Sequence, residues 1–65
     1  MRIKEAREKR GITQRELAEE LGVDQSAISF WEAGKTHPRA SMLPRLTKAL
    51  GCSLDELFAE KEERV

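Results

Sequence analysis

The stretch TQRELAEELGVDQSAISFWEAG, residues 13–34, predicts a pair of short helices joined by a tight turn. Thr13 and Glu16 have the spacing of a capping box, in which each side chain bonds a backbone N–H group that a helix start leaves free. Leu17 and Leu21 follow one turn apart, so they share one face of the first helix. The stretch therefore begins with a capped helix that turns an apolar face inward.

The second half of the stretch predicts a sharp turn and another helix. Gly22 stands where the residue past a helix end needs a positive φ. Asp24 can cap the next helix, whose apolar positions are Ile28 and Trp31. Ala18 is small enough to let the two helices cross closely. Two helices arranged in this way are typical of the helix-turn-helix, whose second helix lies in the major groove of DNA.

These residues resemble the phage Cro and repressor-type helix-turn-helix proteins, also called the xenobiotic-response-element type. The resemblance covers about residues 3–58 and implies a lambda-repressor-like all-α domain that binds a palindromic operator as a symmetric dimer. The motifs that carry it are Thr13-Gln14, Glu16-Leu17-Ala18, Leu21-Gly22-Val23, Gln25-Ser26, Ile28-Ser29, Trp31-Glu32, Gly34-Lys35, Pro38 and Gly51-Cys52-Ser53-Leu54-Asp55.

The chain as a whole predicts one all-α domain of five helices over residues 1–59, followed by a charged tail at 60–65. The first four helices are expected at about residues 3–10, 14–21, 25–33 and 42–50, with Ser41 as the cap of the fourth. The fifth is expected to start at a capping box of Ser53 and Glu56 and to end at about Ala59. The predicted core consists of Ala6, Ile12, Leu17, Ala18, Leu21, Val23, Ile28, Trp31, Leu43, Leu46, Leu50, Leu54 and Leu57.

Composition narrows the class of protein. The 65 residues include no apolar run of 18 that could span a membrane, and the charged start lacks the apolar core of a secretion signal. A single cysteine can form neither an internal disulfide nor a metal cage. With no Gly-rich phosphate loop and no nucleophile beside a base, we expect no enzyme activity, no cofactor and no metal, and a cytoplasmic, nucleoid-associated protein.

The formal net charge is zero, but charge is unevenly distributed. Residues 1–10 carry five basic and two acidic side chains, and residues 33–48 carry four basic and no acidic ones. These two basic segments bracket the second helix of the stretch. DNA binding is therefore expected to depend on local contacts rather than on a strong overall field.

The candidate base-reading residues lie on that helix. Gln25 opens it, and an amide can donate and accept together, as the N7 and N6 edge of adenine requires. Ser26 and Ser29 lie on its exposed side, where a hydroxyl can bond several bases. The resemblance implies that Gln14 contacts phosphate and buttresses Gln25. The alternative for Gln25 is a solvated surface glutamine, and the alternative for Gln14 is a residue that simply occupies the first position of its helix.

Phe30 departs from the polar or basic residue that is common at its position in the family. An exposed phenyl ring at this position could contact thymine methyl groups in the major groove. The alternative is that the ring packs against the loop at 35–40. In that loop Lys35, Thr36 and Arg39 fit phosphate contacts that set the register on the duplex, unless they are simply solvated.

The resemblance also implies an ion pair between Arg7 and Glu32 that ties the first helix to the third, partly buried. Two independent surface charges are the alternative. Such a pair would fix orientation more than it adds stability.

The expected function is sequence-specific binding of double-stranded DNA by a transcriptional regulator, most simply a repressor. Leu54, Phe58 and Pro44 offer a small apolar contact for a weak homodimer that DNA would strengthen. The alternatives are a protein-interaction module, such as an antitoxin or a bridging coactivator with Phe30 as its anchor, and a fragment of a longer regulator.

Overall fold

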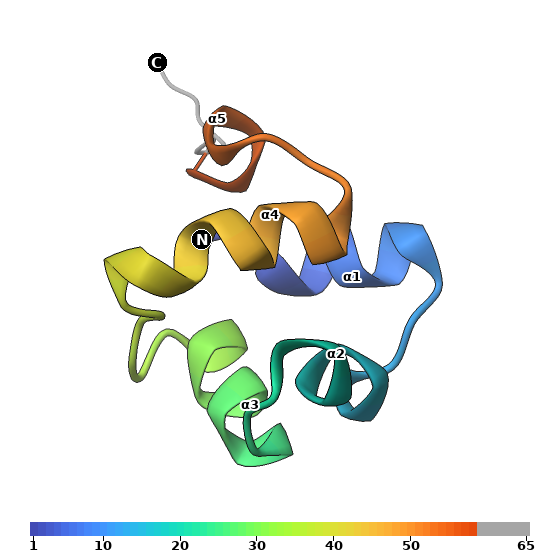
Figure 1. Ribbon diagram of the computed structural model, residues 1–65, viewed down its shortest axis with the longest axis vertical. Helices are drawn as coiled ribbons and strands as arrows, with labels where there is room; N and C mark the ends of the chain where they lie inside the picture. The colour runs from blue at the N-terminus through green and yellow to red at the C-terminus, as the bar shows by residue number, and fades with distance from the viewer. Residues whose placement is uncertain (59–65) are drawn as a thin grey trace.

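This computed structural model describes residues 1–58, which form five α-helices and one 3₁₀ turn joined by short loops. They are α1 (Ile3–Arg10), α2 (Gln14–Leu21), α3 (Gln25–Ala33), η1 (Ala40–Met42), α4 (Leu43–Leu50) and α5 (Leu54–Phe58). Figure 1 shows α1 and α4 in the middle, α2 and α3 at one end and α5 at the other. The predicted all-α class is confirmed, while Ala59 and the tail at 60–65 lie outside the described residues.

Two capping boxes start helices as predicted. At α2 the Glu16 amide donates to Thr13 Oγ1 at 3.0 Å, and the Thr13 amide donates to Glu16 Oε1 at 2.8 Å. At α5 the same exchange joins Ser53 and Glu56 at 3.1 and 2.8 Å. Each box satisfies two backbone donors that a helix start leaves free, which fixes where α2 and α5 begin.

Of two other predicted caps, Asp24 has the predicted position without the capping bond, and the prediction for Ser41 is wrong. Asp24 occupies the N-cap position of α3, but among the described residues its main-chain oxygen, not its side chain, bonds the Ala27 amide, at 3.0 Å. Ser41 lies inside η1, and Met42 takes the N-cap position of α4. The chain enters α4 through a 3₁₀ turn, closed by the Met42 amide on the Arg39 carbonyl at 2.9 Å, so a separate side-chain cap has no place there.

The turn between α2 and α3 depends on Gly22. Its φ is 73°, in the left-handed region that a residue with a Cβ rarely adopts. The next amide, of Val23, donates to the Ala18 carbonyl at 3.0 Å and so closes the end of α2. This geometry turns the chain at once from α2 into α3.

Every helix contributes to one apolar core. The buried members are Ile3, Leu17, Ala18, Leu21, Ile28, Leu46, Ala49, Leu50 and Leu57. The predicted core residues Ala6, Ile12, Val23, Trp31 and Leu43 pack against it but are only partly buried. No helix within residues 1–58 is long and apolar enough to cross a membrane.

Leu54 was wrongly assigned to the core, since it is 44% exposed. It is the first residue of α5, and side chains on a helix lean toward its N-terminus. Leu54 therefore leans past the start of α5 toward solvent, whereas Leu57, one turn later, lies over the core and is 1% exposed.

Candidate nucleic-acid interface

An ion pair joins α1 to the end of α3. Arg7 Nε lies 2.7 Å from Glu32 Oε2, and the two side chains are only 11% and 6% exposed. Arg7 Nη1 also donates to the main-chain oxygen of Ile12 at 2.8 Å. The hydrogen bond to Glu32 raises the pKa of Arg7 against the opposing effect of burial. The pair thus fastens α3 both to α1 and to the segment that leads into α2.

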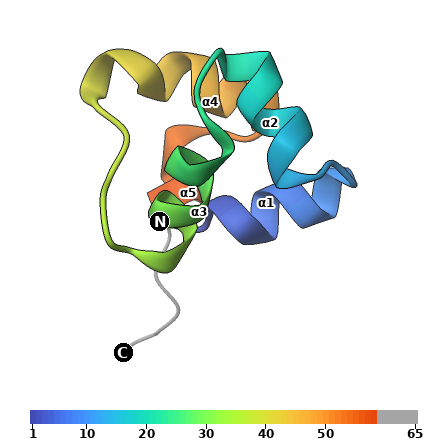
Figure 2. The same cartoon turned by 90° about the horizontal axis from the view of Figure 1, so that it is seen from below.

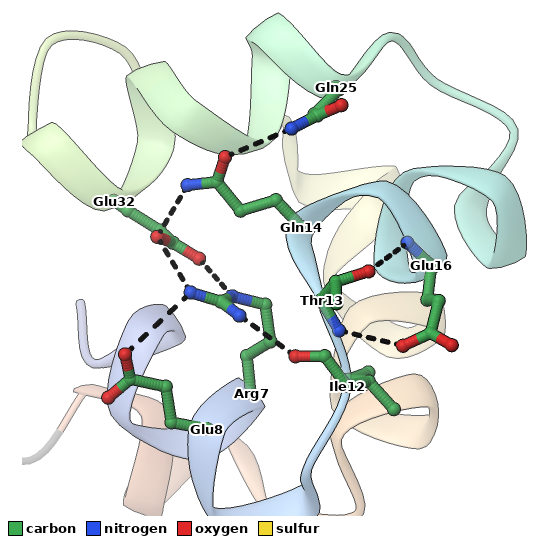
Figure 3. A network of polar contacts seen from close by, with 8 residues as sticks. All are labelled: Arg7, Glu8, Ile12, Thr13, Gln14, Glu16, Gln25 and Glu32. Atoms are coloured by element: carbon green, nitrogen blue, oxygen red, sulfur yellow. Dashed lines mark hydrogen bonds and ion pairs between the residues drawn. The ribbon is translucent and has the colours of Figure 1, made fainter.

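A chain of hydrogen bonds leads from this ion pair to the start of α3 (Figure 3). Gln14 Nε2 donates to Glu32 Oε1 at 2.9 Å, and Gln25 Nε2 donates to Gln14 Oε1 at 3.4 Å. A carboxylate can only accept hydrogen bonds, so Glu32 requires the NH₂ end of Gln14 to face it. The carbonyl end of Gln14 then faces Gln25 and holds the Gln25 amide in one orientation. We call Arg7, Glu32, Gln14 and Gln25 the polar relay.

The Gln14–Glu32 link of the relay and the bond from Arg7 to the main chain of Ile12 were not predicted from the sequence. Gln14 and Glu32 are 18 residues apart, and the Ile12 acceptor is a main-chain atom. The Gln14–Gln25 contact agrees with the buttress that the resemblance implied. Two glutamines and a glutamate occur together in many sequences, so their presence alone does not indicate that their side chains are hydrogen-bonded in the fold.

The outward side of α3 carries the remaining candidate reading residues. Ile28 is fully buried, and a helix turns about 100° per residue, so residues two positions away point to the opposite side. Ser26 and Phe30 occupy that side, Ser29 and Ala33 lie beside them, and all four are exposed. Phe30 is 46% exposed, so any packing against the neighbouring loop leaves much of its ring open to solvent.

The basic loop follows α3 directly and is anchored to the domain. Lys35, Thr36 and Arg39 are exposed, whereas Pro38 between them is buried. The Lys35 amide donates to the Phe30 carbonyl at 2.9 Å, which holds the loop against the last turn of α3. Figure 2 shows the loop passing from α3 to α4 along one side of the domain. The burial of Pro38 was not predicted from the sequence, where Pro38 served as part of the family resemblance.

Metal ligands do not gather in the described part of the chain. Among residues 1–58, no three His, Cys, Asp or Glu side chains are placed to hold a metal ion. Burial, and secondly the charge of Glu56, raises the pKa of the Cys52 thiol, which packs against the core as a small apolar side chain.

Comparison with known proteins gives relatives over most of the chain. A family model described as helix-turn-helix matches residues 3–57. The transcriptional regulator PuuR of Escherichia coli is 44% identical over 62 residues, which are 95% of this chain and 34% of PuuR. Multiprotein-bridging factor 1 of Candida albicans is 35% identical over 66 residues, 92% of this chain and 44% of that protein. This chain thus spans about a third of the length of PuuR and under half of the bridging factor.

The solved structure of a relative agrees in fold as well as in sequence. Repressor protein C2 of Salmonella phage P22 is 45% identical over 57 residues, 88% of this chain and 26% of the repressor. The crystal structure of the P22 c2 repressor with a synthetic operator superposes with a TM-score of 0.80 at 45% identity, covering 86% of this chain and 85% of that one. With the family match and the five-helix arrangement, this likeness establishes that the chain belongs to the phage Cro/repressor-type helix-turn-helix family.

Proposed function

We propose that this chain is a sequence-specific, double-stranded DNA-binding domain of a transcriptional regulator, most simply a repressor. The polar relay is the observation that carries the proposal. It uses two nearly buried charges and the Gln14 amide to orient Gln25, an exposed side chain outside the core. The P22 repressor bound to its operator supports the same assignment by similarity.

In the proposed complex, α3 enters the major groove with Gln25 at its leading end. Because one N–H of the Gln25 amide is held by Gln14, the carbonyl oxygen and the second N–H remain for a base. This combination matches the N6 donor and N7 acceptor of adenine. Gln14 lies at the start of α2, where its remaining N–H is proposed to reach a phosphate, and Ser26 and Ser29 add hydroxyl contacts beside it.

The basic loop is proposed to set the register rather than the sequence preference. Lys35, Thr36 and Arg39 are exposed, and the bond from the Lys35 amide to the Phe30 carbonyl holds the start of the loop beside the last turn of α3. Phosphates are the same at every base pair, so contacts to them fix position without reading sequence. We therefore assign sequence preference to α3 and general affinity to the loop.

Gln25→Ala tests this division directly. On duplexes selected from a random pool by the unmodified chain, the variant should lose ~1–3 kcal/mol of binding free energy and its preference at one base pair per half-site. Lys35→Ala or Arg39→Ala should weaken all sequences alike and lower the salt slope by about one unit per lost phosphate contact. Fluorescence anisotropy over a salt series, with sequencing of the selected pool, measures both effects.

The matched control for the loop variants is Lys48→Ala. Lys48 is an exposed lysine in the last turn of α4, outside the surface formed by α3 and the loop, so its loss should leave the salt slope unchanged. If Gln25→Ala keeps both the affinity and the base preference of the unmodified chain, α3 is not the reading element. A protein-interaction module would then be the better assignment.

Dimerisation on DNA is a separate part of the proposal. Leu54 and Phe58 are 44% and 49% exposed on α5, and the exposed Pro44 adds to the apolar surface proposed to meet a second copy. So small a contact should leave the free chain monomeric. On an operator with half-sites about 10 bp apart, two chains should bind, and Phe58→Ser should weaken only the second binding step. Sedimentation that finds one chain per operator would contradict the dimer.

The relative Multiprotein-bridging factor 1 keeps a second candidate function open, that of a protein-bridging module. The outward side of α3 supports it to the extent that its residues Ser26, Ser29, Phe30 and Ala33 carry no charge. The oriented Gln25 amide favours DNA over a protein partner, because an apolar protein interface would not need it. The Gln25→Ala experiment separates the two functions.

A further inference from the structure

Phe30 is the one large side chain on the outward side of α3. It lies two residues after the fully buried Ile28, a rotation of about 200° around the helix, so it points away from the core. Its neighbours on that side are Ser26, Ser29 and Ala33, all small and exposed. The ring therefore projects beyond its surroundings and would be the first part of this side to meet a surface.

A phenyl ring can read little in the major groove. It has no hydrogen-bond donor or acceptor, so it cannot distinguish the polar edges of the bases. Thymine alone presents an apolar group there, the methyl carbon on C5. We propose that Phe30 selects a thymine by packing on this methyl group. The inference rests on the proposed DNA-binding function and adds a base to the one assigned to Gln25.

The helix geometry predicts where that thymine lies. Phe30 is the fifth residue after Gln25, which is a rise of about 7.5 Å along a helix axis. Successive base pairs are about 3.4 Å apart along a strand. The thymine should therefore lie about two base pairs from the adenine that Gln25 reads, within the same half-site.

Replacing single thymines by deoxyuridine in the selected operator tests the inference, because this exchange removes only the methyl group. At one position per half-site, the unmodified chain should lose about fourfold in affinity, the size expected for one buried CH₂-sized group. Phe30→Ala should bind the thymine and deoxyuridine operators equally. Phe30→Leu, which keeps an apolar side chain, should retain part of the discrimination.

A second pair of duplexes checks the methyl group independently of the base. At the same position, 5-methylcytosine and cytosine both pair with guanine and differ only by that methyl. The unmodified chain should favour 5-methylcytosine by the same factor, and Phe30→Ala should not. Because Phe30 is exposed, thermal unfolding of the variants by circular dichroism should match that of the unmodified chain.

The outcomes separate this inference from the function on which it rests. If the unmodified chain selects an operator but tolerates deoxyuridine at every thymine, the role of Phe30 is wrong while DNA binding stands. The role is also wrong if Phe30→Ala remains sensitive to the methyl group, since another residue then reads it. If Phe30→Ala selects the same operators with the same affinity, Phe30 does not contact DNA, and contact with a protein partner becomes the better assignment for its ring. A chain that selects no duplex at all overturns both proposals.

Discussion

Leu46→Ala is expected to remove most of the stability of the domain. Leu46 is fully buried on α4, the helix that packs against α1, α2 and α5. Truncating such a leucine costs ~2–5 kcal/mol, because transfer free energy is lost and the rigid surroundings leave a cavity. At ~0.05–0.15 kcal/mol per residue, the whole free energy of unfolding is only about 3–10 kcal/mol. Urea unfolding followed by circular dichroism should show a large fall in the midpoint, or a chain already unfolded in buffer.

Leu54→Ala is the matched control, since it is the same substitution in the same domain at a leucine that is 44% exposed. Its cost should be about 1 kcal/mol or less, because little apolar surface returns to water and no closed cavity forms. Equal effects of the two variants would contradict the burial that distinguishes Leu46 from Leu54, and with it the packing of α4 and α5.

Local signals explain how much of this fold could be predicted. The bounds of α1, α2 and α3 agree with the prediction, because glycines at positions of positive φ end each helix and the Thr13/Glu16 box starts α2. These signals act within one or two turns, so they can be recognised in the sequence. The start of α4 was misplaced by one residue, since the intervening 3₁₀ turn carries no comparable signal.

Burial depended on distant packing and was predicted less well. Trp31 is apolar and three residues after Ile28, yet it is only partly buried against the core, as is common for so large a side chain. Ala49 was left out of the predicted core, although it is buried. Periodicity identifies the inward side of a helix but not how far its neighbours cover it.

The candidate site divides in the same way. The exposure of Ser26 and Phe30 followed from their place opposite Ile28 on the helix. The ion pair of Arg7 with Glu32, across 25 residues, came only from the resemblance to a family. Contacts over such distances require the folded arrangement of α1, α2 and α3, which no local pattern encodes.

Breaking the Arg7–Glu32 pair is the second large effect that we expect. The side chains are 11% and 6% exposed, so Arg7→Ala leaves a carboxylate, and Glu32→Ala a guanidinium, that water can scarcely reach. Each single variant should cost ~3–5 kcal/mol, and the double variant should cost less than the sum of the two, because it strands neither charge. Arg7→Lys keeps the charge but not the fork that reaches both Glu32 and Ile12, and it should remain folded with an intermediate loss.

The exposed pair of Arg15 and Glu19 is the matched control for this cycle. Its atoms are 3.4 Å apart, but its side chains are 78% and 67% exposed, so its coupling should be only ~0.3–0.5 kcal/mol. A coupling for Arg7 and Glu32 as small as this would mean that water reaches both groups and that the pair does not fasten α3.

If the coupling is large, a folded variant with a weakened pair, such as Arg7→Lys, should also lose base preference at the Gln25 position. The reason is that Gln14 orients the Gln25 amide only while Glu32 is itself held in place.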